Sequence, residues 1–173
     1  GGTASTWRKL QPQLAQSSRV CSYDRAGYGF STLGRNLPRD LEHMVRDLAT
    51  MLERSGEPAP YLLAGHSNGG LIVGAYANRY PDRVAGLLFL DAAVTLEEDR
   101  SLPPREPLDE ASRAHLAKIR RCLAHQDAEC ADPAWYRDFP ADLAEAELRN
   151  LAKQDYWRAY LSETEANYRG VLS

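Results

Sequence analysis

The residues best suited to chemistry lie at positions 65–69, where the sequence GHSNG places a serine between small residues. An apolar run of strand length, residues 61–64, precedes this pentapeptide, and a helical pattern follows it. A serine in a sharp turn between a strand and a helix presents its hydroxyl outward. The N–H groups that begin the helix can stabilise an anion formed there. We therefore predict Ser67 as a nucleophile and the backbone N–H of Asn68 as an oxyanion donor; the alternative is a glycine-rich turn with an incidental serine.

Two carboxylates stand at the ends of expected strands. Asp91 follows the apolar run 84–90, and a carboxylate at the C-terminal end of a parallel strand faces the ligand side of a sheet. Asp91 is our candidate for the acid of the site, and the alternative is that it turns the chain into the next segment. Asp24 is interpreted as scaffold, pairing with Arg25 or with nearby N–H groups.

None of the four histidines is an obvious base for Ser67, and a serine without a base is a poor nucleophile at neutral pH. His66 is next to the serine, with its side chain directed elsewhere. His43 is expected on a helix surface. His115 and His125 follow Ser67 in a helical segment and are kept as alternatives for the base.

The three cysteines indicate whether the protein resides in an oxidising or a reducing compartment. Cys122 and Cys130 are eight residues apart in a polar stretch, a spacing that allows a disulfide but also two free thiols. A disulfide requires Cα atoms within about 7 Å and an oxidising compartment; it would favour export, and otherwise a cytoplasmic or exported location stays open. Cys21 lies in an apolar run and is expected as a buried free thiol.

The elements that must position these residues alternate between strand and helix. Three short runs are expected as strands: residues 19–23, 61–64 and 84–90. Helical spacing is found at residues 5–16, 40–52 and 71–80, and Gly56 provides a stop after the second of these. This order indicates an α/β fold with right-handed crossovers. The run 61–64 is apolar throughout, which predicts a strand covered on both faces.

After Asp91 the pattern is helical. One helix is expected around residues 108–123, and a second from Asp142, capped by its own carboxylate with Glu145 three residues on, as far as Gly170. The aromatic residues of this segment are expected to pack it rather than to line an acyl pocket. We divide the chain into a core, residues 1–91, and a helical lid or cap, residues 92–173.

Composition excludes several classes of protein. The 173 residues carry 21 basic and 24 acidic side chains, a net charge of −3, so no basic field for nucleic acid exists. No apolar run approaches the roughly 20 residues needed to span a bilayer. No cofactor and no metal site is predicted, and the oligomeric state is left open.

Several motifs in one order resemble those of the α/β-hydrolase family. They are GGTASTW at 1–7, YDRAGYGFS at 23–31, GHSNGG at 65–70, YPDRV at 80–84 and LFLD at 88–91. The resemblance covers residues 1–91, the central part of that fold, and the rest is similar to its variable helical lid. It implies a partial parallel sheet with three recognisable strands, of which 61–64 and 84–90 are parallel neighbours with Ser67 and Asp91 at the same edge. The strand at 19–23 would lie about two strand spacings away, or close up into direct pairing.

The resemblance also implies a function. A serine hydrolase of this fold would cleave an ester or similar acyl bond of a small-molecule substrate through an acyl-enzyme on Ser67. The family's histidine would lie beyond Ser173, and its second oxyanion donor before Gly1, so the site is expected to be incomplete in this chain. The alternatives are an inactive truncated product or binding module, and a cofactor-free perhydrolase or acyltransferase.

Overall fold

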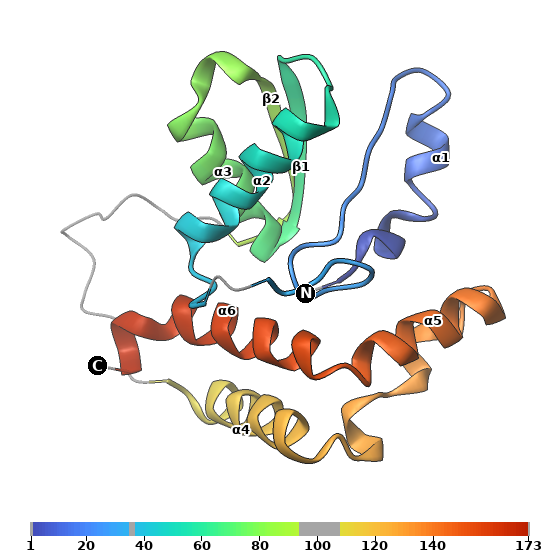
Figure 1. Ribbon diagram of the computed structural model, residues 1–173, viewed down its shortest axis with the longest axis vertical. Helices are drawn as coiled ribbons and strands as arrows, with labels where there is room; N and C mark the ends of the chain where they lie inside the picture. The colour runs from blue at the N-terminus through green and yellow to red at the C-terminus, as the bar shows by residue number, and fades with distance from the viewer. Residues whose placement is uncertain (1, 35–36, 94–107, 173) are drawn as a thin grey trace.

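The computed structural model describes residues 2–34, 37–93 and 108–172. Figure 1 shows β1 and β2 beside α2 and α3, with α4, α5 and α6 in a separate layer. The helices are α1 (Gln11–Leu14), α2 (Leu41–Ser55), α3 (Asn68–Arg79), α4 (Glu110–His125), α5 (Ala141–Leu151) and α6 (Gln154–Leu172). The strands are β1 (Tyr61–Ser67) and β2 (Val84–Ala92). Short 3-10 turns occupy Ala4–Trp7, Pro81–Arg83, Ala128–Cys130 and Pro133–Tyr136.

The two strands form a parallel pair, as predicted, with Leu63 opposite Leu87. Helix α3 is the crossover between them and buries Ile72 and Tyr76 against the sheet side that carries Leu63. A parallel pair needs such a crossover because the chain must return to the same end of the sheet. The α/β interpretation is therefore confirmed.

Helix α2 begins and ends where its sequence predicts. The Asp40 carboxylate accepts a hydrogen bond from the backbone N–H of His43 at 3.0 Å, which satisfies a donor that the first turn leaves without a partner. Gly56 follows the last turn with a φ of 70°, a left-handed conformation that glycine adopts without strain. The buried stripe is Met44, Val45, Leu48 and Ala49.

The prediction of a strand at residues 19–23 is wrong. This segment is irregular, and within the described chain the sheet holds only β1 and β2. A strand is stabilised by the ladder it forms with a neighbour, and neither β1 nor β2 pairs with this segment. Cys21 is consequently exposed rather than buried.

The expectation that residues 61–64 are covered on both faces is also wrong. Leu63 is buried beneath α3 and α2, whereas Leu62, which points to the opposite face, is 72% exposed. Leu88, on the neighbouring strand, is exposed as well. Both described helices of this layer pack on the same side of the sheet, so an apolar face is left open among the described residues.

The helical region, defined here as α4, α5 and α6, has its own core. Ile119 and Cys122 from α4 pack against Tyr156 and Trp157 from α6. Two residues of the loop after Asp24, Tyr28 and Leu33, belong to the same cluster. The expected packing role holds for Tyr156 and Trp157 but not for Trp135, which is 80% exposed.

The helix expected from Asp142 to Gly170 is two helices. Helix α5 ends at Leu151, and α6 begins at Gln154. The indole N–H of Trp157 donates to the carbonyl of Leu151 at 2.7 Å, so a side chain of α6 satisfies a carbonyl that the end of α5 leaves free. The expected cap is wrong too, because α5 begins after Pro140 with no side-chain cap.

In the described ranges, no helix has the length and apolar character needed to cross a bilayer.

Candidate active site

Ser67 occupies a strained turn at the C-terminal end of β1. Its φ is 51° and its ψ is −128°, a conformation that residues other than glycine adopt only when the surrounding structure holds them there. A Cβ on Gly65 would lie 2.5 Å from the Gly69 carbonyl oxygen, and one on Gly70 would lie 2.5 Å from the Cβ of Ala92. The small residues around the serine are therefore required by the close approach of strand and helix, and Ser67 is left exposed.

The neighbouring strand holds this turn in place. Ser67 is the register partner of Ala92, and the backbone N–H of Ala93 donates to the Ser67 carbonyl at 2.9 Å. Asp91 therefore lies at the same edge of the sheet, as predicted, with a positive φ of 43°. Its side chain is exposed and is not among the residues that line the cavity beside Ser67, so its role as the acid stays a prediction.

Asn68 is the first residue of α3. The N–H groups of a first helical turn have no acceptor within the helix, which is the property that the predicted oxyanion donor needs. The Asn68 side chain contacts the helical region: its Oδ1 accepts a hydrogen bond from Nδ2 of Asn167 on α6 at 3.2 Å. The helical region thus contacts the turn that carries the serine.

A cavity of about 220 Å³ lies beside Ser67. Ser67, Asn68 and Arg25 line it from the sheet side. From the helical region it is lined by His115 of α4 and by five residues of α6: Tyr160, Glu163, Thr164, Asn167 and Tyr168. The cavity therefore lies between the two layers of the molecule and is open to solvent, and its lining is mostly polar side chains.

A buried ion pair joins the two sides of the cavity. Arg25 Nη2 lies 2.9 Å from Glu163 Oε2, with side-chain exposures of 14% and 3%. The Tyr28 hydroxyl donates to the same oxygen at 2.9 Å. Burial and the Glu163 charge raise the pKa of Tyr28 well above its ordinary value, so this hydroxyl remains a donor at neutral pH. Since Arg25 and Glu163 neutralise each other, the pair adds no net charge to the cavity.

His115 reaches the cavity, which its position in the sequence does not reveal. Its Nε2 lies 3.0 Å from the hydroxyl of Tyr160. Desolvation is the main cause that lowers the pKa of His115, and the lowered pKa favours the neutral imidazole at pH 7. His115 is bonded to Tyr160 and His43 to Asp40, and no hydrogen bond joins any of the four histidines to Ser67 among the described residues.

The scaffold interpretation of Asp24 is confirmed. Its Oδ1 accepts from the backbone N–H of Ala4 at 2.7 Å, and its Oδ2 accepts from that of Phe30 at 3.1 Å. A Cβ on Gly29 would lie 2.2 Å from Oδ2. The carboxylate therefore folds the loop that carries Arg25 to the cavity.

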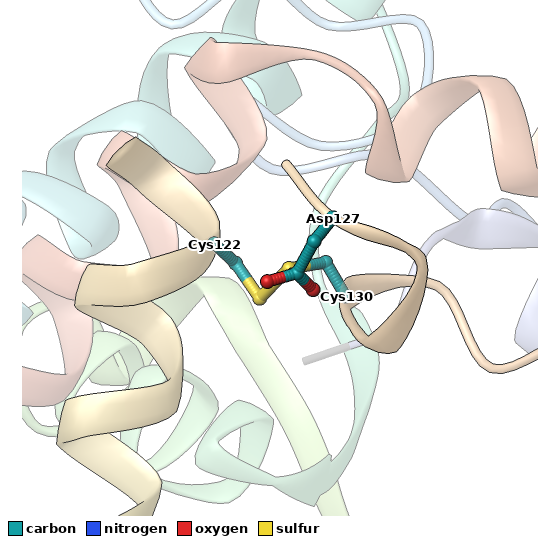
Figure 2. Close-up of side chains that lie close together, drawn as sticks. All are labelled: Cys122, Asp127 and Cys130. Carbon is teal, nitrogen blue, oxygen red and sulfur yellow. A yellow bond between two sulfur atoms is a disulfide. The ribbon is translucent and has the colours of Figure 1, made fainter. Parts of the chain in front are cut away.

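Cys122 and Cys130 form a disulfide, with their Cα atoms 5.5 Å apart. Figure 2 shows the Asp127 carboxylate beside it, and one candidate ligand atom from each of these three residues lies within 4.8 Å of the others. Metal binding by cysteine requires the thiolate, which neither sulfur provides while the disulfide is formed. Asp127 instead caps a turn through the N–H of Glu129 and pairs with Arg121.

The model of the alpha/beta hydrolase fold family matches residues 1–162. The chain belongs to this family. A protein of Bacillus subtilis named YqjL, described only as uncharacterized, is 31% identical over 94 residues, which are 54% of this chain and 37% of that protein. A (lyso)-N-acylphosphatidylethanolamine lipase of Bos taurus is 34% identical over 95 residues, 53% of this chain and 27% of the lipase. The matched part thus spans little more than a third of these relatives at most.

Solved structures show the same fold. Cfl2 from Burkholderia cenocepacia superposes with a TM-score of 0.67 at 24% identity, covering 98% of this chain and 63% of that one. A hydrolase from Oleispira antarctica superposes with a TM-score of 0.65 at 17% identity, and the match covers 95% of this chain and 61% of that one. The α/β-hydrolase resemblance drawn from the motifs is confirmed.

Proposed function

We propose that this chain carries the nucleophile of a serine hydrolase that cleaves an ester or a similar acyl bond. The observation that supports this most is the conformation of Ser67, a strained non-glycine residue between strand and helix that opens onto a cavity. Strain of this kind persists where the fold imposes it, and it is concentrated at functional sites. The lipase among the relatives acts on an acyl compound by its name, which is consistent with this chemistry.

In the proposed reaction Ser67 Oγ bonds to the acyl carbon while a base takes the hydroxyl proton. The bond to the leaving alcohol breaks, and the alcohol departs with that proton. Water then attacks the acyl-enzyme, releases the acid and restores the serine. The Asn68 N–H stabilises the negative oxygen in both steps.

The base is assigned to a histidine outside these 173 residues, because the described histidines have other positions or partners. Asp91 would orient that histidine from the edge of the sheet. The helical region would serve as the lid of the site, since α4 and α6 provide one wall of the cavity.

The test is the rate at which a fluorophosphonate labels Ser67, followed by intact mass and peptide mapping. We expect slow labelling of the chain, acceleration by added imidazole as a substitute base, and no labelling of Ser67→Ala. Ser31→Ala, with its serine in a loop outside the cavity, is the matched control and should behave like the parent chain. Failure of imidazole to promote any labelling would favour the inactive binding module. Fast labelling without imidazole that His115→Ala abolishes would place the base within this chain.

A further inference from the structure

The wall of the cavity that faces Ser67 contains a hydrogen-bonded pair from two different helices. His115 comes from α4 and Tyr160 from α6, with Nε2 and the hydroxyl oxygen 3.0 Å apart. Their rings also meet edge to face, with centroids 5.5 Å apart. The relative position of the two side chains is therefore set both by a hydrogen bond and by ring packing.

This wall is held against the serine turn by contacts that are separate from the pair. Asn167 donates to Asn68 beside the serine, and Glu163 is bound to Arg25 and Tyr28. Tyr160, Glu163 and Asn167 are about one helical turn apart along α6, so they lie on the same face of the helix. Tyr160, on the same face of α6, lines the same cavity as Ser67.

The pair has hydrogen-bonding capacity left over. A tyrosine hydroxyl has one proton and two lone pairs, and His115 uses one of these. If the hydroxyl donates to the imidazole, its oxygen can still accept; if the imidazole donates, the hydroxyl proton is free. In either tautomer Tyr160 can bind one more polar group that enters the cavity.

The chemistry of the cavity limits what that group can be. The Arg25 and Glu163 charges are paired with each other. The pKa of His115 is lowered by desolvation and by Lys118, and that of Tyr160 is raised by burial. Both shifts favour the uncharged side chain at neutral pH, so the cavity favours a neutral hydrogen-bonding group over an anion. Its volume of about 220 Å³ is below the roughly 300–1,000 Å³ of pockets that take drug-sized ligands.

We propose that His115 and Tyr160 select the substrate: they bind a compact, uncharged ester that carries a hydroxyl or carbonyl group near its ester carbon. This rests on the proposed function, because the ester is the one that Ser67 would attack. The pair is a specificity determinant, since it binds a part of the substrate that does not react. Long unbranched acyl chains would have no group near the ester that could use the pair.

The test measures binding without turnover, so that it does not depend on the reactivity of the serine. The Ser67→Ala chain is titrated with methyl 2-hydroxypropanoate and with methyl 2-methylpropanoate, which differ only by a hydroxyl in place of a methyl. Binding is followed by NMR shifts of the histidine and tyrosine rings. One hydrogen bond is worth a preference of about threefold to tenfold for the hydroxy ester, and we expect the shifts at His115 and Tyr160.

Added to Ser67→Ala, Tyr160→Phe should reduce this preference to about one, and His115→Ala, which removes the partner that orients the hydroxyl, should reduce it in part. His125→Ala, at the far end of α4 and outside the cavity, should retain it. Circular dichroism and the unfolding midpoint check that each variant is folded, and Tyr160→Phe keeps the ring and its packing. Equal binding of the two esters, no binding of either, or a preference that survives both substitutions would overturn the proposal. If the preference is observed but the serine of the parent chain is never labelled, the recognition pair stands and the hydrolase proposal fails.

Discussion

At the scale of single residues, the Arg25–Glu163 ion pair is expected to be costly to break, because both side chains are buried. Glu163→Gln leaves the buried guanidinium without a counter-charge, and breaking such a pair costs about 3–5 kcal/mol of unfolding free energy. Glu165→Gln is the matched control, two residues along the same helix, where the partner Arg120 is 58% exposed. Exposed pairs contribute at most about 1 kcal/mol. Urea unfolding of both variants checks this, and equal losses of unfolding free energy would show that the buried pair stabilises the fold no more than the exposed pair.

Two tyrosines, the partly buried Tyr23 and the fully buried Tyr28, predict a loss of stability in alkali. Burial raises the pKa of Tyr23 to about 12 and that of Tyr28 well above its ordinary value, whereas in the unfolded chain both ionise near pH 10. Above pH 10 the unfolded state therefore binds fewer protons than the folded state, and the free energy of unfolding falls as pH rises toward 12.

Urea unfolding at pH 8, 10 and 11 measures this decline. Tyr28→Phe removes one of the two groups and should flatten the pH dependence, although it also lowers stability at pH 8 because the hydrogen bond to Glu163 is lost. An unfolding free energy that stays constant between pH 8 and 11 would contradict the prediction.

At the scale of elements, helix α2 depends on its first residues. Asp40 accepts from the N–H of His43 and also lies 2.6 Å from its Nδ1. Asp40→Ala removes the cap and should lower the unfolding free energy by about 1 kcal/mol. Asp40→Asn keeps an acceptor and should lose much less. Thermal and urea unfolding compare the two, and an equal effect would mean that the cap is not the source of the stability.

At the scale of the whole molecule, the open face of the sheet predicts self-association. Leu62 and Leu88 are exposed on it, and each described strand has a ladder partner on one side only. Unpaired strand edges next to exposed apolar side chains favour association with another chain. We therefore expect the chain to form oligomers as its concentration rises.

Leu62→Lys should shift sedimentation toward the monomer by placing a charge on that face. Phe30→Lys is the control, since Phe30 is as exposed but lies in the loop after Asp24. Oligomers that persist in Leu62→Lys, or that disappear equally in Phe30→Lys, would exclude the sheet face as the cause.

The sequence by itself determined the local structures of this protein. The stop at Gly56 and the strand–turn–helix around Ser67 each depend on residues a few positions apart, and both formed as predicted. The cap at Asp40 is equally local, although it was not predicted from the sequence. The motif order also identified the family. Local propensity and steric limits act over one or two turns of chain, so a single sequence contains what is needed to predict them.

Only the tertiary structure decided which distant segments meet. Residues 19–23 have strand composition, but a strand needs a ladder partner, and β1 and β2 pair only with each other. His115 joins the cavity beside Ser67 because α4 and α6 pack together, and Tyr28 enters the core of the helical region because Asp24 folds its loop. Contacts of this kind are set by how layers pack, which no pattern within a short stretch of sequence encodes.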